Sequence, residues 1–577
     1  MFSHLTKAYK VLDKKEKKIF FLVILLSFFS AIFEMLGVAL ILPVLAVLLK
    51  DQISENIEIL GMNLSNVTFD FENYSLVFLL SVLVGIFVFK NIILFFVNYF
   101  NNWYVQRIGN RISQNIYKQY MNENYSFHLE NNSSKLMYNC IGAVENFVIA
   151  LSNILLIFGE ILIILFLATL LILVEPKGFL LGFIFIVIAS FVILRTLKNF
   201  IIRWGQEAQT ADRERIFHIS HGLDGIREIK IFKKANYFLD KFFKSTKRRF
   251  EIAHYYNSLT ALPRYSLECF FVAALVLFLF YLKINDKPNH EIILILGIFG
   301  MGSIRLMPSF NKLLMALQKF KFGYKHIDTM HNIIFKDSFF KNNNNVSMNG
   351  IENLENKNQE TLVNFENVGF KYPEKKKDIF KQIDLKIYKN EFLGIVGKTG
   401  VGKSTLLNLI LGLHFPTKGN ITRNFNEISF VPQSIFVLDD TILKNIAFGI
   451  EDSSINVNLA AECIKKAQLE NFVEKLPNGI NTIVGERGTK ISGGELQRLA
   501  IARALYVKPD IIIFDEATAS LDVYTEKKII EIIKNLSKLN TVVFVSHKLE
   551  NLRHCNRVIK VENSQIVDFK MDNEKLN

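Results

Sequence analysis

The sequence predicts an α-helical transmembrane domain of six spans, fused to a C-terminal α/β P-loop domain. Half of the 577 residues are hydrophobic and 53 are Phe, which makes the chain too apolar for an ordinary soluble protein and too long for one domain. Six long apolar segments come first, and a glycine-rich phosphate loop follows them near residue 400. These observations indicate a membrane part followed by a phosphate-binding part.

Residues 1 to 18 are expected to form an amphipathic helix on the membrane surface. Leu5, Ala8, Tyr9 and Leu12 recur at helical spacing among many lysines. A solvated lysine-rich leader is the alternative. The apolar run that follows is too long for a signal peptide, so we expect it to remain as a membrane segment.

Six apolar segments are long enough to cross a hydrocarbon core of roughly 30 Å, which needs about 20 helical residues. They cover residues 19 to 49, 75 to 100, 146 to 174, 178 to 200, 256 to 282 and 291 to 318. Several are longer than needed, so helices that project into the cytoplasm are expected. Pro43 or Pro308 is expected to kink a helix or to mark where it leaves the lipid. The transmembrane domain is assigned to residues 19 to 335.

The charges between the spans predict their orientation. Residues 51 to 74 include five acidic and no basic residues, whereas residues 203 to 249 are crowded with Lys and Arg. The positive-inside rule therefore places the first loop outside and both termini in the cytoplasm. The net charge of +14 accordingly favours membrane-flanking loops over nucleic acid. Four scattered cysteines without metal-binding spacing are expected to be free thiols in a reducing compartment.

The inner connections are too long to be simple turns. Residues 101 to 145 and 201 to 255 have helical character and are expected to form stalks toward the C-terminal part. Within the second, DGIREIKIF (Asp224 to Phe232) is expected to be a short docking helix, with an ordinary exposed amphipathic helix as the alternative. Residues 336 to 361 are polar and Asn-rich, which predicts a linker.

The C-terminal domain, residues 362 to 577, alternates strands with helices, as α/β folds do. Strands are expected at 362 to 366, 383 to 387, 392 to 396, 428 to 431, 511 to 514 and 542 to 545.

The stretch GIVGKTGVGKSTLLNLILGL, from Gly394 to Leu413, contains the G-x-x-x-x-G-K-[ST] phosphate loop between an apolar strand and an apolar helix. Backbone N–H groups of such a loop turn toward phosphate oxygens, and the helix adds the positive end of its dipole. Lys403 is expected to neutralise the β- and γ-phosphates, and Ser404 to ligate Mg²⁺. An ordinary glycine-rich turn is the alternative. The nucleotide contacts are assigned to Gly397, Lys398, Thr399, Gly400, Val401, Gly402, Lys403, Ser404 and Thr405.

Two further motifs point to phosphate chemistry. In IIIFDEAT, Asp515 and Glu516 end an apolar strand, where one carboxylate can hold Mg²⁺ and the other can activate water. A strand that merely ends in two solvated acids is the alternative. In ISGGELQR (Ile491 to Arg498), a hydroxyl and two glycines lead into a helix, which is another anion-binding N-terminus.

In this order the motifs resemble those of ATP-binding cassette (ABC) transporters of the exporter type, and the resemblance covers nearly the whole chain. It implies an α/β P-loop ATPase (ABC) domain with ATP and Mg²⁺ as cofactors. Glu516 would be the general base, and His547 would contact the γ-phosphate. The resemblance also implies that Tyr372 stacks on adenine and that Gln433, Asp515 and Ser404 bind Mg²⁺. The nucleotide-binding signature would consist of Ser492, Gly493, Gly494 and Glu495. Ser520 and Asp522 would lie at a subunit contact, and GERG (Gly485 to Gly488) near the coupling helices.

Three departures from the family pattern stand out. Glu495 replaces the commoner glutamine, ASLD interchanges serine and alanine, and a short stretch between Lys403 and Gln433 predicts a trimmed hairpin or loop. In this family ATP lies between the phosphate loop of one cassette and the signature of another. The resemblance therefore implies a dimer, and the intact motif positions favour a homodimer over a specialised heterodimer.

Charged residues within the spans are costly to insert and usually face a cavity or a partner, and here they include Glu34. Lys90, Arg264 and Arg305 are candidates to receive a phosphate or pyrophosphate, while Arg264 and Glu268 at i, i+4 spacing would equally pair with each other. With the segments PRYSLE and SIRLMPS, these residues resemble the bacterial flippases for lipid-linked oligosaccharides. That resemblance implies a bacterial inner-membrane protein that moves a polyprenyl-pyrophosphate-linked glycan outward. The alternatives are an exporter of lipid A-like lipids, drugs or peptides, and an ATP-gated channel or regulatory membrane protein.

Overall fold

The computed structural model describes residues 2–39, 58–59, 62–63, 76–174, 176–284, 289–335, 361–372, 377–485, 491–518 and 521–570. The chain divides into two compact units. The first comprises residues 1–123 and 128–341, and the second comprises residues 124–127 and 342–577. Several predictions fall outside the described residues: the linker before Thr361, most of the loop 51 to 74, Pro43, Ser520 and residues 486 to 488.

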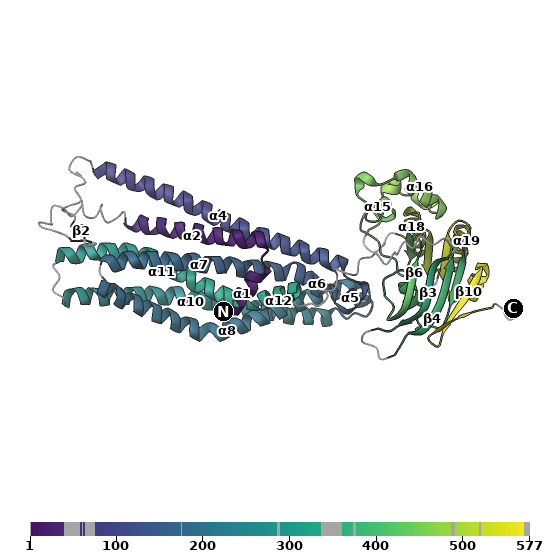
Figure 1. The fold of residues 1–577 in the computed structure, drawn as a ribbon, viewed down its shortest axis with the longest axis horizontal. Helices are drawn as coiled ribbons and strands as arrows, with labels where there is room; N and C mark the ends of the chain where they lie inside the picture. Colours follow the sequence, from purple (N-terminus) through teal and green to yellow (C-terminus); the bar gives the residue numbers. More distant parts are fainter. Residues whose placement is uncertain are drawn as a thin grey trace. The chain divides into compact units, whose positions relative to one another are not determined.

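Six long helices form most of the first unit, as Figure 1 shows. They are α2 (Lys14–Ala39), α4 (Leu76–Asn122), α7 (Gly142–Val174), α8 (Pro176–Asp224), α10 (Ala235–Ile284) and α11 (Asn289–Phe322). Among the described residues, five stretches are long and apolar enough to cross a membrane: Lys14–Ala39, Ser81–Asn122, Ser133–Leu173, Gly182–Asp224 and Ala235–Ile284. The sixth predicted span lies in α11, where many side chains are outside the described set, and it stays a prediction.

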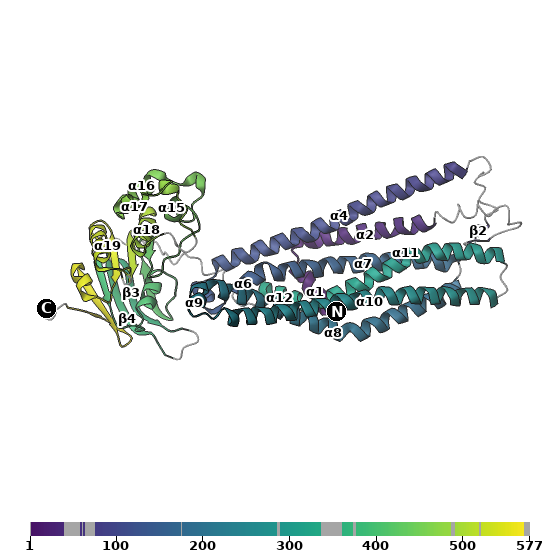
Figure 2. The ribbon, with the colours of Figure 1, turned by 180° about the vertical axis from the view of Figure 1, so that it is seen from behind.

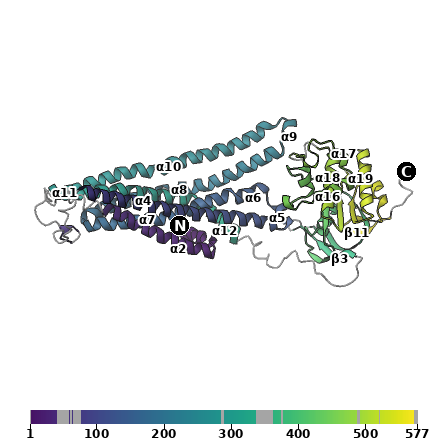
Figure 3. The ribbon, with the colours of Figure 1, turned by 90° about the horizontal axis from the view of Figure 1, so that it is seen from above.

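The helices of this unit are longer than a bilayer requires. The helices α8 and α10 have 49 and 50 residues, which at a rise of about 1.5 Å per residue is roughly 75 Å each. They pack along each other, and short helices α5 (Tyr125–Glu130), α6 (Ser133–Cys140) and α9 (Ile226–Ile231) form the connections (Figure 3). The expected helical character of the two inner connections is therefore confirmed, and their extension toward the C-terminal part stays a prediction. Helix α9 lies within the expected Asp224 to Phe232 helix, but its docking stays a prediction.

The N-terminal segment is helical over only part of the expected range. Helix α1 (Phe2–Val11) ends before α2 begins, and the carboxylate of Glu16 accepts a hydrogen bond from the backbone of Asp13 at the start of α2 (3.0 Å). Helix α1 packs against α12 (Tyr324–Phe335), with Ala8 and Val11 buried. Figure 2 shows the same unit from behind, with α4 next to α2. The helix therefore has protein neighbours on its apolar face.

The second unit contains two sheets. The larger has the order β11-β10-β5-β9-β8-β7, formed by β5 (Phe392–Val396), β7 (Ile428–Val431), β8 (Ile511–Asp515), β9 (Thr541–Val545), β10 (Arg557–Glu562) and β11 (Gln565–Asp568). All its neighbouring strands are parallel except β10 and β11. The smaller sheet is antiparallel with the order β4-β3-β6, formed by β3 (Thr361–Phe370), β4 (Phe380–Tyr388) and β6 (Lys418–Arg423).

Helices cover the larger sheet on both faces, which explains its apolar strands. They include α14 (Lys403–Ile410) on one face and α18 (Gly493–Tyr506) and α19 (Val523–Leu536) on the other, while α15 (Ile442–Ile446) and α16 (Val457–Lys466) pack against α18. In β8, Ile511 and Ile513 pack with the antiparallel sheet and α14, whereas Ile512 and Phe514 pack with α18 and α19. The core thus has two layers, one on each side of the strands that lead into the motifs.

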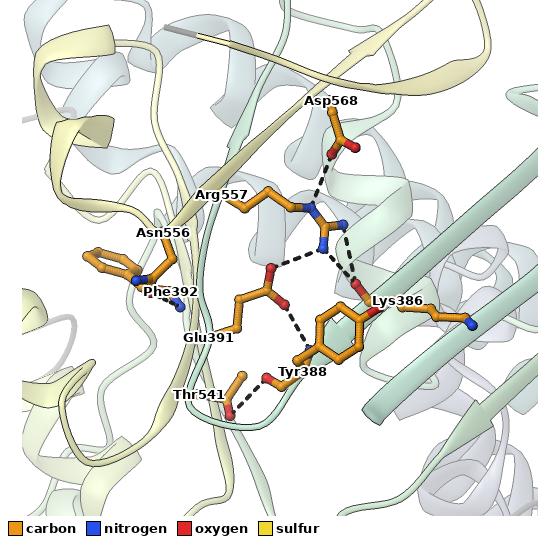
Figure 4. A network of polar contacts seen from close by, with 8 residues as sticks. All are labelled: Lys386, Tyr388, Glu391, Phe392, Thr541, Asn556, Arg557 and Asp568. Carbon is orange, nitrogen blue, oxygen red and sulfur yellow. Dashed lines mark hydrogen bonds and ion pairs between the residues drawn. The ribbon is translucent and has the colours of Figure 1, made fainter. Parts of the chain in front are cut away.

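Arg557 joins the two sheets at their edge (Figure 4). Its guanidinium donates to the carboxylates of Glu391 and Asp568 at 3.1 Å each and to the carbonyl of Lys386 at 3.2 Å. Glu391 is buried and also accepts from the backbone N–H of Tyr388 at 2.8 Å. Burial raises the pKa of Glu391, and Arg557 opposes that rise. The network fixes β4 against β5, β10 and β11.

Candidate functional site

Four neighbouring parallel strands deliver the motif residues to one edge of the larger sheet. Strand β5 leads into the phosphate loop, β9 into His547, β8 into Glu516 and β7 toward Gln433. In the sheet register, Ile395 of β5 and Asp515 of β8 both pair with Val545 of β9. Parallel strands end on the same side, and ligands of open α/β sheets bind outside these ends.

The phosphate loop has a backbone that suits a bound anion. Gly400 and Gly402 have φ angles of 81° and 116°, in the left-handed region that glycine adopts without strain. Among the described atoms, none lies within 4 Å of a Cβ built on Gly400, so the loop is open there. Lys398 and Thr399 are exposed, and α14 begins at Lys403. The loop and helix therefore fit the phosphates of a nucleotide.

Lys403 points back into the loop and is only 7% exposed. Its Nζ donates to the carbonyl of Gly397 at 2.8 Å and lies 3.3 Å from Nε2 of His547. Oε1 of Glu516 is 3.7 Å from the same Nζ. Burial lowers the pKa of Lys403, and the carboxylates of Glu516 and Asp515 oppose this. The ammonium is thus held among groups that a phosphate could replace.

Glu516 contacts Lys403, Gln433 and His547, and we call these four residues the phosphate-loop cluster. Its φ of 49° is left-handed, which in a non-glycine residue costs on the order of 1–3 kcal/mol. One carboxylate oxygen lies 2.6 Å from Nε2 of His547, and the other accepts from Nε2 of Gln433 at 3.1 Å. The structure therefore brings together Lys403, Gln433, Glu516 and His547, four residues that the sequence motifs single out. Their catalytic roles stay predictions.

Asp515 ends β8 and Ser404 lies in the first turn of α14, after the phosphate loop, and both offer oxygen atoms that could ligate the metal ion of a bound nucleotide. Burial raises the pKa of Asp515, and the neighbouring Glu516 raises it further, while Lys403 and His547 oppose the rise. Ser404 is exposed in the first turn of α14. Oxygen ligands of this kind suit Mg²⁺, which usually takes one or two carboxylates together with substrate phosphates. The residues present therefore fit the expected ion.

Tyr372 lies beside the start of α14. Its hydroxyl is 3.2 Å from Oγ1 of Thr405, and its ring meets the rings of Phe370 and His414 at 5.0 and 5.5 Å. His414, which the sequence motifs did not mark, is 2% exposed, and burial lowers its pKa. The aromatic ring expected at adenine is thus supported from behind by a packed cluster.

The signature residues form a separate local structure. Ser492 caps α18, and its hydroxyl and backbone N–H both donate to the carboxylate of Glu495, at 2.6 and 2.9 Å. A Cβ at Gly494 would lie 2.4 Å from Cγ2 of Thr525, so glycine permits α18 to approach α19. Asp522 caps α19 by accepting from the N–H of Thr525 at 2.9 Å. Among the described residues, no hydrogen bond joins Ser492 or Glu495 to the phosphate-loop cluster.

Arg503 is a site residue that sequence reasoning missed. It lies on α18 and donates to the carbonyls of Phe436 and Asn445 at 2.7 Å each, and to Oδ1 of Asn445 at 3.0 Å. These contacts hold the segment after Gln433 against the helix that begins with the signature. No motif signals this contact, because it depends on which backbone carbonyls the fold places beside α18.

In the membrane unit, Lys90 of α4 and Arg305 of α11 meet on Glu34 of α2. Nζ of Lys90 lies 3.1 Å from Oε2 of Glu34, and Arg305 pairs with Oε1 of the same carboxylate. Glu34 is 1% exposed. A Cβ at Gly37 would come within 2.9 Å of Nζ of Lys90, so the small residue makes room for the ammonium.

Arg264, the third cavity candidate, lies apart from this group. It pairs with Glu268 one turn away at 3.4 Å, and both side chains are exposed. In a single chain, the structure therefore shows the alternative that the sequence left open, an i, i+4 pair of Arg264 and Glu268. A role of Arg264 in substrate binding stays a prediction.

A second buried charge was missed in the sequence. Glu160 of α7 lies 3.7 Å from Nζ of Lys312 of α11 and is 7% exposed. Arg305 and Lys312 are seven residues apart, so they lie on one face of α11. An ionisable residue within a span is the signal that could have identified Glu160.

Comparison with known proteins supports the same division. A family model described as ABC transporter matches residues 380–519, and one described as ABC transporter transmembrane region matches residues 20–300. An export ATP-binding/permease protein of Rickettsia typhi is 37% identical over 219 residues, which is 36% of this chain and 38% of that protein. An ATP-dependent lipid A-core flippase of Ralstonia nicotianae is 35% identical over 217 residues, 35% of this chain and 37% of that protein. The match thus spans little more than a third of these relatives.

The fold comparison extends over nearly the whole chain. The structure of a bacterial Atm1-family ABC exporter with ATP bound aligns with a TM-score of 0.73 and covers 96% of this chain and 94% of that one. The sequence identity is 19%, so this likeness shows a common fold.

Proposed function

Because the chain belongs to the ABC transporter family, we propose that it is an ATP-driven exporter, with ATP hydrolysis coupled to transport. The observation that carries this proposal is the convergence of Lys403, Gln433, Glu516 and His547 at one sheet edge, around an open phosphate loop. An intact general base favours turnover over a purely gating or regulatory role.

Each residue of the cluster has a role that its position supports. Cleavage of ATP releases the free energy that transport consumes. The phosphate-loop backbone and Lys403 would hold the phosphates, and Ser404, Gln433 and Asp515 would surround Mg²⁺. The Glu516 carboxylate would accept a proton from the attacking water, and His547, 2.6 Å away, would keep that carboxylate oriented.

The working unit is proposed to be a homodimer with cytoplasmic cassettes. Within the signature, Ser492 and Glu495 bond to each other in the first turn of α18. Among the described residues, neither bonds to the phosphate-loop cluster of the same chain. A second copy would bring its own signature to the loop. The cytoplasmic orientation, in a bacterial inner membrane, rests on the positive-inside charge pattern.

The substrate is proposed to be a lipid with an anionic headgroup, specifically a polyprenyl-pyrophosphate-linked oligosaccharide flipped to the outer leaflet. Two cations, Lys90 and Arg305, share the single carboxylate of Glu34 deep in the membrane unit. A buried site with more cations than carboxylates suits a phosphate. Some relatives are named lipid A-core flippases, which makes a lipid A-like lipid the second candidate.

A reconstituted flipping assay with a fluorescent lipid-linked glycan tests the substrate. We expect ATP-dependent movement by the wild type and at least about a 10-fold loss in Lys90→Gln/Arg305→Gln, since the anion loses both partners. The control Lys118→Gln/Arg553→Gln removes the same charges at exposed positions and should flip normally. Unchanged flipping in the first variant would refute the cavity role. Stimulation of ATPase activity by lipid A or a drug, and not by the glycan lipid, would favour the second candidate.

A further inference from the structure

A basic pocket lies in the membrane unit. It shares no residue with the phosphate-loop cluster or with the group formed by Glu34, Lys90 and Arg305. Its volume is about 510 Å³. Four helices line it: α1 with His4, α8 with Lys198, Ile202 and Gln206, α11 with Lys321, and α12 with Tyr324, Lys325 and Asp328. We refer to it as the α1–α12 pocket.

The fold builds this pocket from one face of α8 and the end of α11. Lys198, Ile202 and Gln206 are spaced by four residues and therefore share a face of α8. A Cβ at Gly205 would lie 2.2 Å from the carbonyl oxygen of Phe322, so the glycine allows the two helices to touch. This close approach brings Lys198 and Lys321 to the same cavity.

Helix α1 forms the remaining wall and is held firmly to α12. The ring of His4 stacks on that of Tyr324, with centroids 4.1 Å apart and an interplanar angle of 17°. Nζ of Lys7 lies 2.5 Å from Oδ1 of Asp328, and Nδ1 of His4 lies 3.3 Å from the same oxygen. Asp328 is the carboxylate of the pocket lining, and its charge is therefore already engaged by α1.

The three lysines of the pocket are not neutralised. Among the described residues, none of Lys198, Lys321 and Lys325 has a carboxylate oxygen within 4 Å. Lys321 is half-buried, and burial together with repulsion from Lys198 lowers its pKa. An anion in the cavity would relieve this repulsion. These three lysines thus carry positive charge that no described carboxylate offsets within 4 Å.

The pocket also lies at the expected depth of lipid headgroups. Lys198 is two residues before the end of one predicted span, and Lys321 is three residues beyond the end of another. From Pro176, the start of α8, to Lys198 the helix rises about 33 Å, which is roughly the hydrocarbon thickness. Phe2, at the start of α1, is 85% exposed and so offers apolar contact near the basic cavity.

We propose that the α1–α12 pocket binds the phosphate of a phospholipid headgroup from the leaflet on the cassette side of the membrane. Lysines present point charges that suit phosphate, and basic pockets between membrane helices on this side are typical of lipid headgroup sites. The site shares no residue with the proposed substrate group, so it stands whether or not the transported molecule is a lipid-linked glycan. It depends on the proposed orientation only for the choice of leaflet.

Native mass spectrometry of the purified full-length protein tests this directly. The protein is mixed with equal amounts of dioleoyl phosphatidic acid and dioleoyl phosphatidylcholine, and retained lipids are counted. We expect the wild type to retain phosphatidic acid selectively and Lys198→Gln/Lys321→Gln/Lys325→Gln to bind it about 10-fold more weakly or worse. Equal retention by that variant would overturn the proposal.

A matched control has the same charge change elsewhere. Lys10→Gln/Lys15→Gln/Lys319→Gln removes three exposed lysines of α1, α2 and α11 that do not line the pocket, and it should retain phosphatidic acid like the wild type. An equal loss in this control would show general charge attraction and refute a specific pocket.

A gain-of-function variant covers the case in which the triple variant fails to fold. Gln206→Lys adds a fourth cation on the same face of α8 and should increase retention of phosphatidic acid; unchanged or weaker retention would contradict the site. Glycerol 3-phosphate at the same concentration should not displace the bound lipid. If glycerol 3-phosphate displaced the bound lipid as efficiently as added phosphatidic acid does, the pocket would bind free phosphate compounds, and the proposal of a lipid headgroup site would be refuted.

Discussion

Glu516 places its carboxylate between His547 and Gln433 while its backbone adopts a left-handed conformation. Such strain in a non-glycine residue persists only where the surroundings fix it, and it gathers at functional sites. Here the neighbouring strands fix it, since the N–H of Glu516 donates to the carbonyl of Val545 on β9 at 3.2 Å.

Replacement of the proposed base separates binding from hydrolysis. Glu516→Gln keeps the size and a hydrogen-bonding oxygen but cannot accept a proton from water, so we expect ATP binding to remain and ATP turnover to fall about 100-fold or more. Phosphate release and nucleotide-binding assays on the purified protein measure both. Glu550→Gln, at an exposed position of the cassette, is the control. Near-normal turnover in Glu516→Gln would show that another group is the base.

His326 on α12 is expected to make the membrane unit less stable in acid. It is 2% exposed, and burial with repulsion from Arg213 and Arg249 lowers its pKa from 6.5 to about 4. Between these two pH values the unfolded chain binds more protons than the folded one, so stability falls as the pH falls. The loss from about pH 7 to about pH 5 is about 2 kcal/mol.

Thermal unfolding in detergent across this pH range checks the effect. His326→Gln should flatten the part of the pH dependence below about pH 6.5, whereas His254→Gln, with an exposed ring, should leave it unchanged. An acid-induced loss of stability that is identical in wild type and His326→Gln would rule out this histidine as its source.

At the scale of elements, one carboxylate links three membrane helices. Glu34 of α2 binds Lys90 of α4 and Arg305 of α11 at once. Glu34→Gln would leave the buried Lys90 and the partly exposed Arg305 without a counter-charge, so we expect a loss of about 3 kcal/mol and a lower melting temperature in detergent. Glu268→Gln, in an exposed pair with Arg264, should cost at most about 1 kcal/mol. Equal, small shifts in the two variants would contradict the buried link.

The sequence best predicts the strands of the larger sheet that lead into the motifs. The ranges 392 to 396, 428 to 431, 511 to 514 and 542 to 545 agree with β5, β7, β8 and β9 to within a residue, because short, mostly apolar runs mark these strands. The strand β6 was missed, since only Ile421 of its six residues is buried. The strands β10 and β11 were also missed, and none of the four residues of β11 is buried.

The helices were predicted in the right places. Helix α4 has 47 residues because it joins the span expected at 75 to 100 to the start of the helical connection expected at 101 to 145, and hydrophobicity marks only the part in lipid. The motif order predicted the four residues of the phosphate-loop cluster, since each of these residues follows a recognisable strand. The pairs Glu160–Lys312 and Arg503–Asn445 were not predictable in this way, because they depend on which elements become neighbours.

At the scale of the whole molecule, the chain supplies one membrane unit and one cassette. Its phosphate-loop cluster and its signature are each well formed, yet they are not bonded to each other among the described residues. If a second copy completes each site, then one chain supplies the phosphate loop of that site and the other chain supplies its signature. A loop defect in one chain and a signature defect in the other then fall in the same site, and the second site of the dimer stays intact.

ATPase activity of mixed dimers tests this arrangement most directly. Lys403→Ala and Ser492→Arg are each expected to be inactive as pure homodimers, because every site then lacks one half. Dimers purified with one chain of each kind contain one site with an intact loop and an intact signature. We predict that they recover about half of the wild-type activity by simple counting of sites. Absence of any recovery in these mixed dimers would contradict a site shared between two chains.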